Sequence, residues 1–338
     1  MATLKDVAAL AGVSTATASL SLNGGPVNAK TRETVKQAAK KLNYIPNKVG
    51  QILTGGRSNA IEMIILTADE HPNIVRKTSL FYYLMEGVLA VSDQRNVAVR
   101  FAVKSYDDPN LVSYFAELVG GRLVDGAIII PQFARDAHFA RPLLIADFPF
   151  VMLRPAAFGE DINFVDMGNE RGGRLVADLF IRSGARRIGI VNGPARHVDA
   201  IERERGFSAA LLEGGASLVG HTNGDFTIES GYAAMERMSA RPLPDAIFCT
   251  NDYMAAGALK FLRSRGVRVP SDVLLVGYDN FDIATAMDPE LTTVDNRFYD
   301  LGHALASNLL SLIDRQIENV SVNVEPRLVL RQSHLGAR

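Results

Sequence analysis

The chain has 338 residues, 47% of them hydrophobic, which is long enough for two or three domains with a sizeable core. The single cysteine, Cys249, excludes an intrachain disulfide, and no run of about 18 apolar residues is present to cross a membrane. The charge is uneven, because residues 1–58 carry a net charge of +6 while the remaining 280 residues sum to −7. A basic N-terminal segment predicts a polyanionic partner for that segment alone, although a solvated basic face is the alternative. Because the N-terminus shows no secretory signal, we expect a cytoplasmic protein.

The first sixty residues predict three short helices. Thr3, Ser14 and Asn28 are each positioned to cap a helix, and the apolar residues that follow each cap recur at helical spacing. Gly12 ends the first helix, and residues 23–24 end the second, because Asn and Gly tolerate positive φ. Two short helices joined by a tight turn and followed by a third are typical of a helix-turn-helix unit. An ordinary small helical bundle is the alternative.

The second predicted helix carries small, uncharged side chains, as expected of a helix that lies in the DNA major groove. Thr15, Ala16 and Leu20 would face the bases, where methyl groups can contact thymine. Neighbouring hydroxyl and amide side chains could bond phosphates, which positions a helix without reading sequence. These are Ser14, Thr17, Ser19 and Asn23.

The segment that follows, residues 43–58, reads NYIPNKVGQILTGGRS and has the composition of a linker. It nevertheless keeps Val49, Ile52 and Leu53 in helical register, and minor-groove proteins use such side chains as wedges between base steps. Gly50 disfavours the helix by roughly 1 kcal/mol. We therefore expect this segment to fold only when DNA and the copy from a second chain are present.

From residue 60 onward, apolar runs alternate with helix-length stretches. This alternation is typical of parallel sheets with helices on both faces, and the number of strands favours two such sheets in tandem. In open sheets of this kind, ligands bind beyond the carboxyl ends of the strands. Strands are predicted at 60–66, 97–103, 124–130, 186–192, 245–250 and 272–279, and helices at 169–183, 198–213, 252–266 and 297–313.

Polar side chains stand at two of these strand ends, where Asn251 and Asp279 follow apolar runs. Arg203 lies on a predicted helix, and Phe226 and Phe298 lie near other loop ends. Carboxylate, amide and guanidinium groups suit a ligand rich in hydroxyls, and aromatic rings cover the C–H face of a sugar. We interpret these residues as a sugar site, although each alone also fits a turn, a core position or a surface ion pair.

Enzymatic motifs are absent from the sequence, which has no P-loop, dinucleotide fingerprint, zinc-protease motif or nucleophile elbow. Its six histidines show no metal-ligand spacing. We therefore expect no catalytic site, no metal and no cofactor. A sugar-binding transport component and a sugar-acting enzyme are the alternative functions.

The combined motifs resemble the lactose- and galactose-repressor family of bacterial transcription regulators. The N-terminal strings are TLKDVAALAGVS, LNGGPVNAKTRE, AAKKLNYIPN and NKVGQILTG, and the body carries VDGAII, RERGFSAAL and PELTTVDN. The resemblance implies an all-α helix-turn-helix headpiece, a hinge helix, and a periplasmic-binding-protein-like α/β core of two doubly wound parallel-sheet subdomains with an effector cleft between them. The implied bounds are 1–46 for the headpiece, 47–58 for the hinge, 59–157 with 296–322 for the N-terminal core subdomain, and 158–295 with 323–333 for the C-terminal one.

The resemblance also implies roles for individual residues. DNA-backbone contacts fall on Ser14, Thr17, Ser19, Asn23, Asn28, Thr31, Tyr44 and Asn47, with Leu53 as the intercalating leucine. Effector contacts fall on Arg203, Phe226, Asn251, Asp279 and Phe298, with Asn296 as a further candidate. Many members have Arg at the position of Leu20, and Arg reads guanine. We therefore expect this chain to prefer a different operator base there.

Two departures concern the effector and the assembly. Residues 67–80 look like an insertion, and Arg154 stands where some sugar-binding relatives have an acid, so an anionic or phosphorylated effector is an alternative to a neutral sugar.

No leucine heptads follow the last predicted strand, so we expect a homodimer on double-stranded, pseudo-palindromic operator DNA. A small carbohydrate would control this repressor, as inducer or as corepressor.

Overall fold

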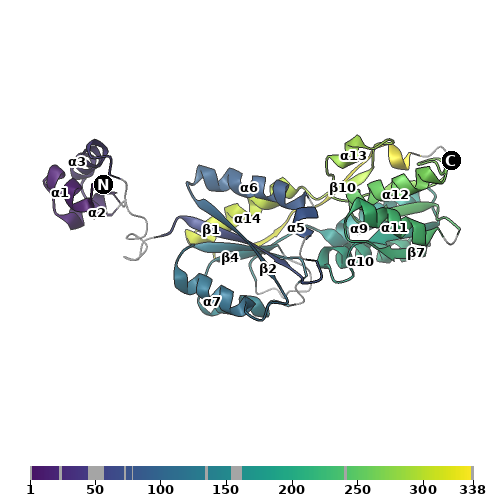
Figure 1. Ribbon diagram of the computed structural model, residues 1–338, viewed down its shortest axis with the longest axis horizontal. Coiled ribbons are helices and arrows are strands. Elements are labelled where there is room, and N and C mark those ends of the chain that lie inside the picture. Colours follow the sequence, from purple (N-terminus) through teal and green to yellow (C-terminus); the bar gives the residue numbers. More distant parts are fainter. Residues whose placement is uncertain are drawn as a thin grey trace. The chain divides into compact units, whose positions relative to one another are not determined.

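The computed structural model describes residues 2–22, 25–44, 57–71, 74–77, 79–133, 136–153, 162–239 and 242–335. The chain divides into two compact units, Met1–Ser58 and Asn59–Arg338 (Figure 1). The larger unit, which we call the core, contains both parallel sheets. None of the described helices combines the length and the apolar character needed to cross a membrane.

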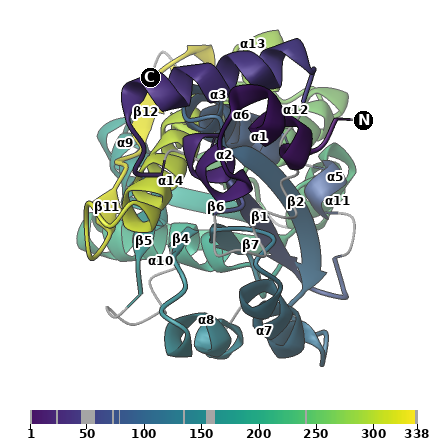
Figure 2. The same ribbon diagram turned by 90° about the vertical axis from the view of Figure 1, so that its left-hand side faces the viewer.

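The N-terminal unit is built from α1 (Leu4–Ala11), α2 (Thr15–Leu22) and α3 (Ala29–Lys41), the purple helices of Figure 2. The predicted caps are confirmed. The Thr3 hydroxyl accepts from Asp6 N at 3.4 Å, and Thr3 N donates to the Asp6 carboxylate at 2.7 Å. Gly12 ends α1 at φ +66°, a conformation that glycine adopts without strain. The small hydrophobic core of this unit consists of Val7, Ala8, Ala18, Val35, Ala38 and Ala39.

The first core subdomain is a six-stranded sheet in the order β11-β5-β4-β3-β1-β2, with parallel pairing between neighbours. Alternate residues of β1 enter opposite layers, so that Ile61 and Met63 pack under one set of helices and Ile64 and Leu66 under the other. The strands are β1 (Ala60–Thr67), β2 (Ala98–Ser105), β3 (Gly126–Pro131), β4 (Phe150–Leu153), β5 (Phe164–Asp166) and β11 (Ser321–Asn323). The helices are α5 (Ile74–Lys77), α6 (Leu80–Gln94) and α14 (Phe298–Ile313) with one layer, and α7 (Leu111–Gly121), η1 (His138–Ala140) and α8 (Arg141–Ile145) with the other (Figure 1).

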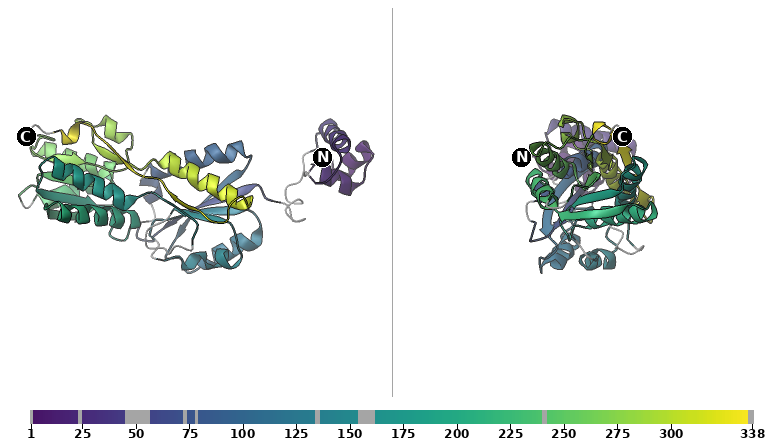
Figure 3. Two further views of the ribbon diagram at one scale, coloured as in Figure 1. Left: turned by 180° about the vertical axis from the view of Figure 1, so that it is seen from behind. Right: turned by 90° about the vertical axis from the view of Figure 1, so that its right-hand side faces the viewer.

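The second core subdomain is a four-stranded parallel sheet in the order β7-β6-β8-β9. Helices α9 and α10 pack with one hydrophobic layer, and α11 and α12 pack with the other (Figure 3, left). The elements are α9 (Asn169–Arg182), β6 (Arg187–Asn192), α10 (Val198–Glu213), β7 (Ser217–Asn223), α11 (Ile228–Met238), β8 (Ala246–Cys249), α12 (Asp252–Ser264), β9 (Leu274–Val276) and α13 (Ile283–Ala286). A separate antiparallel pair joins β10 (Thr293–Asp295) to β12 (Arg327–Val329), and η2 (Gln332–His334) follows.

The predicted strands and helices are confirmed, each with ends within three residues of the observed ones. The predicted start of the second subdomain at residue 158 is wrong. Met152 pairs with Phe164 and Leu153 with Val165, so β5 belongs to the first sheet and the chain crosses only after Asp166. A three-residue strand is too short for alternation of side chains to predict it.

Candidate functional site

Helix α2 presents a buried side and an exposed side. Ala18 is fully buried, while Thr15, Ala16 and Leu20 are exposed, and Leu20 retains 43% of its accessible surface. The exposed side carries no charge and no long side chain, so the backbone of α2 can approach another surface closely. This is the geometry that a helix in a major groove requires.

Several predicted phosphate contacts also hold the headpiece together. The Ser14 hydroxyl accepts from Thr17 N at 3.1 Å and bonds the Thr17 hydroxyl at 2.9 Å, which caps α2. The Asn28 side-chain oxygen accepts from Thr31 N at 2.7 Å and caps α3. Tyr44 is half-buried against the core of this unit. The predicted contacts Asn23, Asn47 and Leu53 lie outside the described residues, as do most of the hinge 47–58 and Arg154.

A pocket lies inside the core, between its two subdomains, with a volume of about 320 Å³ including solvent at its mouth. Its walls come from the carboxyl ends of strands, from the N-terminal parts of helices, and from loops in both subdomains, as expected for this fold class. The lining residues are Ile74, Leu80, Gln132 and Phe298 from the first subdomain, and His197, Asp199, Arg203, Phe226, Asn251, Asp279 and Phe281 from the second.

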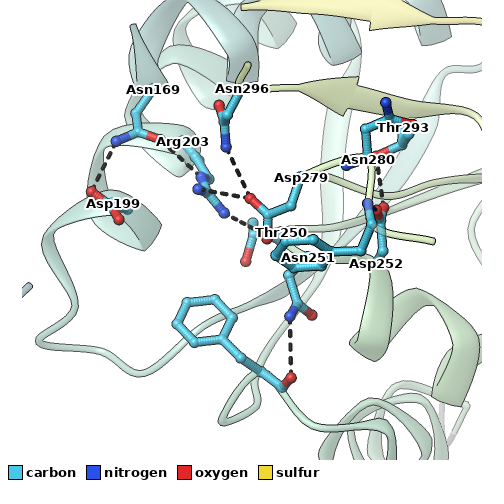
Figure 4. Close-up of polar contacts among 12 residues, drawn as sticks. Asn169, Asp199, Arg203, Thr250, Asn251, Asp252, Asp279, Asn280, Thr293 and Asn296 are labelled. Carbon is cyan, nitrogen blue, oxygen red and sulfur yellow. Dashed lines mark hydrogen bonds and ion pairs between the residues drawn. The ribbon is translucent and has the colours of Figure 1, made fainter. Parts of the chain in front are cut away.

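Arg203 is the centre of the polar wall, and its guanidinium is almost completely buried. Nε donates to the side chain of Asn169 at 2.9 Å, and Nη1 donates to the carbonyl of Thr250 at 2.7 Å (Figure 4). Nη2 lies 3.1 Å from Asp279 Oδ1, and the guanidinium carbon lies 3.9 Å from the centre of the Tyr278 ring. Each side of the cation is therefore held, which fixes the position of the wall.

Asp279 carries the opposing charge of this pair. It stands three residues after the end of β9 and adopts φ +103°. Asn296 Nδ2 also donates to Asp279 Oδ1, at 2.9 Å (Figure 4). Burial raises the pKa of Asp279 to about 6, and the neighbouring Arg203 charge opposes that rise. The carboxylate is therefore mostly ionised at pH 7.

Asn251 and Asp252 stand at the start of α12, shortly after the end of β8. The Asn251 side-chain oxygen accepts from Met254 N at 2.8 Å and caps the helix, while its amide donates to the Phe226 carbonyl at 3.1 Å. Asp252 is fully buried and accepts from the Thr293 hydroxyl at 2.6 Å and from Phe281 N at 2.8 Å (Figure 4). Asp252 therefore fixes the loop that carries Phe281, while Asn251 fixes the backbone of Phe226.

A row of rings forms another wall of the pocket. His197 lies edge-on between Phe133 and Phe226, with its ring centre 4.9 Å from each. Burial lowers the pKa of His197 to about 4, so the imidazole is neutral at pH 7. Two further lining residues, Phe281 and Phe298, stack with their ring centres 5.9 Å apart. Aromatic faces of this kind suit the C–H face of a sugar ring or a planar ligand.

The structure brings together five of the six predicted effector residues, namely Arg203, Phe226, Asn251, Asp279 and Phe298. Asn296 is absent from the lining, and its Nδ2 donates to the lining residue Asp279. The sequence reasoning did not identify Gln132, His197, Asp199 and Phe281. Two signals were available, because Gln132 directly follows β3 and Asp199 lies four residues before Arg203 on α10.

The described residues contain no group of three or more His, Cys, Asp or Glu side chains that could hold a metal ion. The pocket walls consist of hydrogen-bonding groups and rings, so they can position a small molecule by polar contacts and by apolar surface.

Comparisons with known proteins place this geometry in a family. Residues 3–47 match the description "Bacterial regulatory proteins, lacI family", and residues 177–334 match "Periplasmic binding protein-like domain". The HTH-type transcriptional regulator CelR of Thermobifida fusca is 34% identical over 342 residues, 98% of each chain. The HTH-type transcriptional repressor PurR of Haemophilus influenzae (strain PittEE) is 32% identical over 346 residues, again 98% of each.

Two solved structures match almost the whole chain. A CelR–cellobiose complex is 32% identical, with a TM-score of 0.73 over 98% of this chain and 100% of that one. The lac repressor dimer bound to operator and the anti-inducer ONPF is 28% identical, with a TM-score of 0.83 over 99% of both chains. The names of the sequence relatives are those of a transcriptional regulator and a transcriptional repressor. The chain belongs to the LacI family of DNA-binding transcriptional regulators, with a helix-turn-helix headpiece and a periplasmic-binding-protein-like core.

Proposed function

We propose that this protein is a cytoplasmic repressor that binds operator DNA as a homodimer and responds to a small carbohydrate. The observation that carries the effector proposal is the pocket itself. The Arg203–Asp279 ion pair, Asn251 and aromatic side chains line it, and both subdomains contribute lining residues. The likeness to a CelR–cellobiose complex, at 32% identity over almost the whole chain, supports a sugar as the effector.

For DNA binding, we propose that Thr15, Ala16 and Leu20 face base edges in the major groove. Their exposure on one side of α2, with Ala18 buried on the other, supports this assignment. Phosphate contacts are proposed for Ser14, Thr17, Ser19, Asn23, Asn28, Thr31, Tyr44 and Asn47, and minor-groove intercalation for Leu53. The proposed regions are a headpiece at 1–46, a hinge at 47–58 and two core subdomains joined around the pocket.

For the homodimer, the edge of the first sheet is a suitable contact surface. Strand β2 stands last in the strand order, and Phe101 and Val103 on it are 47% and 41% exposed. An edge strand that bears exposed apolar side chains is suited to cover by a partner chain. The dimer would set the two headpieces on two half-sites of one operator.

For control, we propose that the ligand changes the angle between the two core subdomains, because both contribute to the pocket walls. Moving such an equilibrium from 1:99 to 99:1 requires about 5.5 kcal/mol of preference for one state. A buried pocket with several polar contacts can supply a preference of this size.

A gel-shift titration on the DNA upstream of the gene for this protein, at two salt concentrations, tests the DNA-binding proposal. We expect specific binding in the range of roughly 10⁻⁸ to 10⁻¹¹ M, weaker at higher salt. Addition of an effector found by thermal-shift screening should change that affinity. Equal affinity for the upstream fragment and for unrelated DNA would contradict the proposal.

A further inference from the structure

We propose that the core pocket accepts an uncharged, hydroxyl-rich ligand and rejects its phosphorylated or carboxylated counterpart. This inference rests on the proposed effector function of the same pocket and defines the chemical class of the ligand. It follows from the charges, the hydrogen-bonding valence and the burial of the described residues that line the walls.

The first step concerns charge. Among the described lining residues, Arg203 is the only Lys or Arg, and its charge is opposed by Asp279 at 3.1 Å. Its other sides donate to Asn169 and the Thr250 carbonyl, so the cation is committed to holding the protein. Asp199 adds a second carboxylate to the lining. An anionic ligand would therefore enter a wall that already carries more negative than positive charge.

The second step concerns the remaining ionisable ring. His197 is 3% exposed and lies edge-on between Phe133 and Phe226. In this apolar setting the imidazole stays neutral at pH 7, because burial lowers its pKa to about 4. The Asp199 carboxylate lies 4.0 Å from His197 Nδ1. His197 therefore supplies no positive charge to an anionic ligand.

The third step concerns cations near the pocket. Arg196, which precedes α10, contacts Glu70 and Asp107, each at 3.2 Å. Arg331 donates to Asn280 at 2.7 Å and to the Leu291 carbonyl at 2.9 Å. Both residues are engaged elsewhere through their Nη atoms, and neither is among the residues that line the pocket.

The fourth step concerns hydrogen-bonding valence. Gln132 Oε1 is buried without a hydrogen-bond partner, and Gln132 lines the pocket. Asp199, whose side chain accepts from Asn169 Nδ2 at 3.0 Å, adds further acceptor oxygens. A wall rich in acceptors is satisfied by donors. Sugar hydroxyls donate, whereas a carboxylate or a phosphate dianion only accepts.

The test is a binding screen on the full-length protein with matched pairs. Pentoses, hexoses, hexitols and disaccharides, cellobiose among them, are compared with their phosphate esters and sugar acids by thermal shift and then by calorimetry. We expect at least one uncharged member to bind at least about 100-fold more tightly than its charged counterpart, because juxtaposed like charges are strongly unfavourable in an interface.

Asp199→Asn removes one lining charge with little change in shape. It should lower the ratio of affinities, uncharged over charged, by about 10-fold through better binding of the charged member. Asp93→Asn, at an exposed position on α6, is the matched control and should leave the ratio unchanged.

Tighter binding of a charged member, or a screen in which no uncharged member raises the melting temperature, would overturn this inference. A ratio that is the same in Asp199→Asn and in the native chain would also overturn the electrostatic argument. The gel shift on the same preparations reports DNA binding separately, so failure of this inference is distinguishable from failure of the proposed regulatory function.

Discussion

Arg196 Nη2 lies 3.2 Å from Asp107 Oδ1, and this ion pair connects the two core subdomains. Arg196 precedes α10 in the second subdomain, whereas Asp107 follows β2 in the first. Arg196 Nη1 also lies 3.2 Å from Glu70, in the segment 67–80 that the sequence marked as an insertion. Elsewhere between the subdomains, the hydroxyls of Ser79 and Tyr253 are 2.6 Å apart. Relative motion of the subdomains must therefore break or rearrange these contacts.

Arg196→Gln should favour a more open arrangement of the core. The contacts are partly exposed, so each contributes only about 0.2–1 kcal/mol, and we expect a population shift of a few-fold. Spin labels at Glu117→Cys on α7 and Glu236→Cys on α11 report the distance between subdomains, because Cys249 is buried and does not compete for labelling. Arg174→Gln, which breaks a pair with Glu213 inside the second subdomain, is the control. Identical distance distributions in both variants would contradict this role for Arg196.

Arg203→Ala should destabilise the fold as well as remove a pocket side chain. It leaves Asp279 buried without its cation, and breaking a buried pair on one side typically costs about 3–5 kcal/mol. Urea unfolding measures this loss. Arg205→Ala, two residues further along α10 and paired with Glu170 at the surface, should cost less than about 1 kcal/mol. Similar losses of unfolding free energy in the two variants would show that the buried pair stabilises the fold no more than the surface pair does.

His197 should make stability depend on pH in a defined window. Its folded pKa of about 4 lies below the ordinary value of 6.5, so its contribution is complete above pH 6.5 and is lost as the pH falls through 4. Asp279 acts in the opposite sense, because its folded pKa of about 6 is raised above 3.8 and its contribution is lost as the pH rises through 6. Asp279 is present in both the native chain and a His197 variant. The difference between their free energies of unfolding therefore reports the contribution of His197 alone.

We expect the free energy of unfolding of the native chain, relative to His197→Gln, to fall by about 3 kcal/mol between pH 6.5 and pH 4. Urea titrations at several pH values measure this difference, and His303→Gln at an exposed position is the control. A difference that stays constant across the window would mean that His197 is not neutral in the fold.

Gly206→Ala should disturb the pocket by separating α10, which carries Arg203, from α9. A Cβ at Gly206 would overlap the carbonyl oxygen of Glu170, because α9 and α10 pack with their backbones in close approach. Separation of these helices would displace Arg203, so we expect lower stability, by about 1–3 kcal/mol, and weaker ligand binding. Gly120→Ala on α7 has open space around its Cβ and should be neutral or slightly stabilising. Thermal unfolding compares the two.

Ala16→Glu should weaken operator binding at least about 100-fold, since it places a negative charge where we expect DNA. Ala16 is exposed on α2, so the headpiece should remain folded, which circular dichroism checks. Gln37→Glu adds the same charge on an exposed position of α3 and is the matched control. Operator affinities that decrease equally in the two variants would indicate a general charge effect and would contradict a specific role for this side of α2.

The sequence by itself determined the local structure. Capping residues such as Thr3 and Asn28, and apolar runs such as 60–66, depend on neighbours close in the chain, and their helices and strands are present where predicted. The strand-end rule likewise placed Asn251 and Asp279 in one pocket.

Only the tertiary structure decided how distant side chains are paired. Gln132 and His197 became pocket residues because β3 and the start of α10 meet, and the bond from Val198 N to the Gln132 carbonyl at 3.0 Å joins segments of different subdomains. Burial also decided the charges, since the sequence cannot show that His197 is neutral or that Arg203 is fully engaged. Hydrogen bonds, ion pairs and desolvation act between atoms adjacent in space, and that adjacency exists only after the two subdomains pack together.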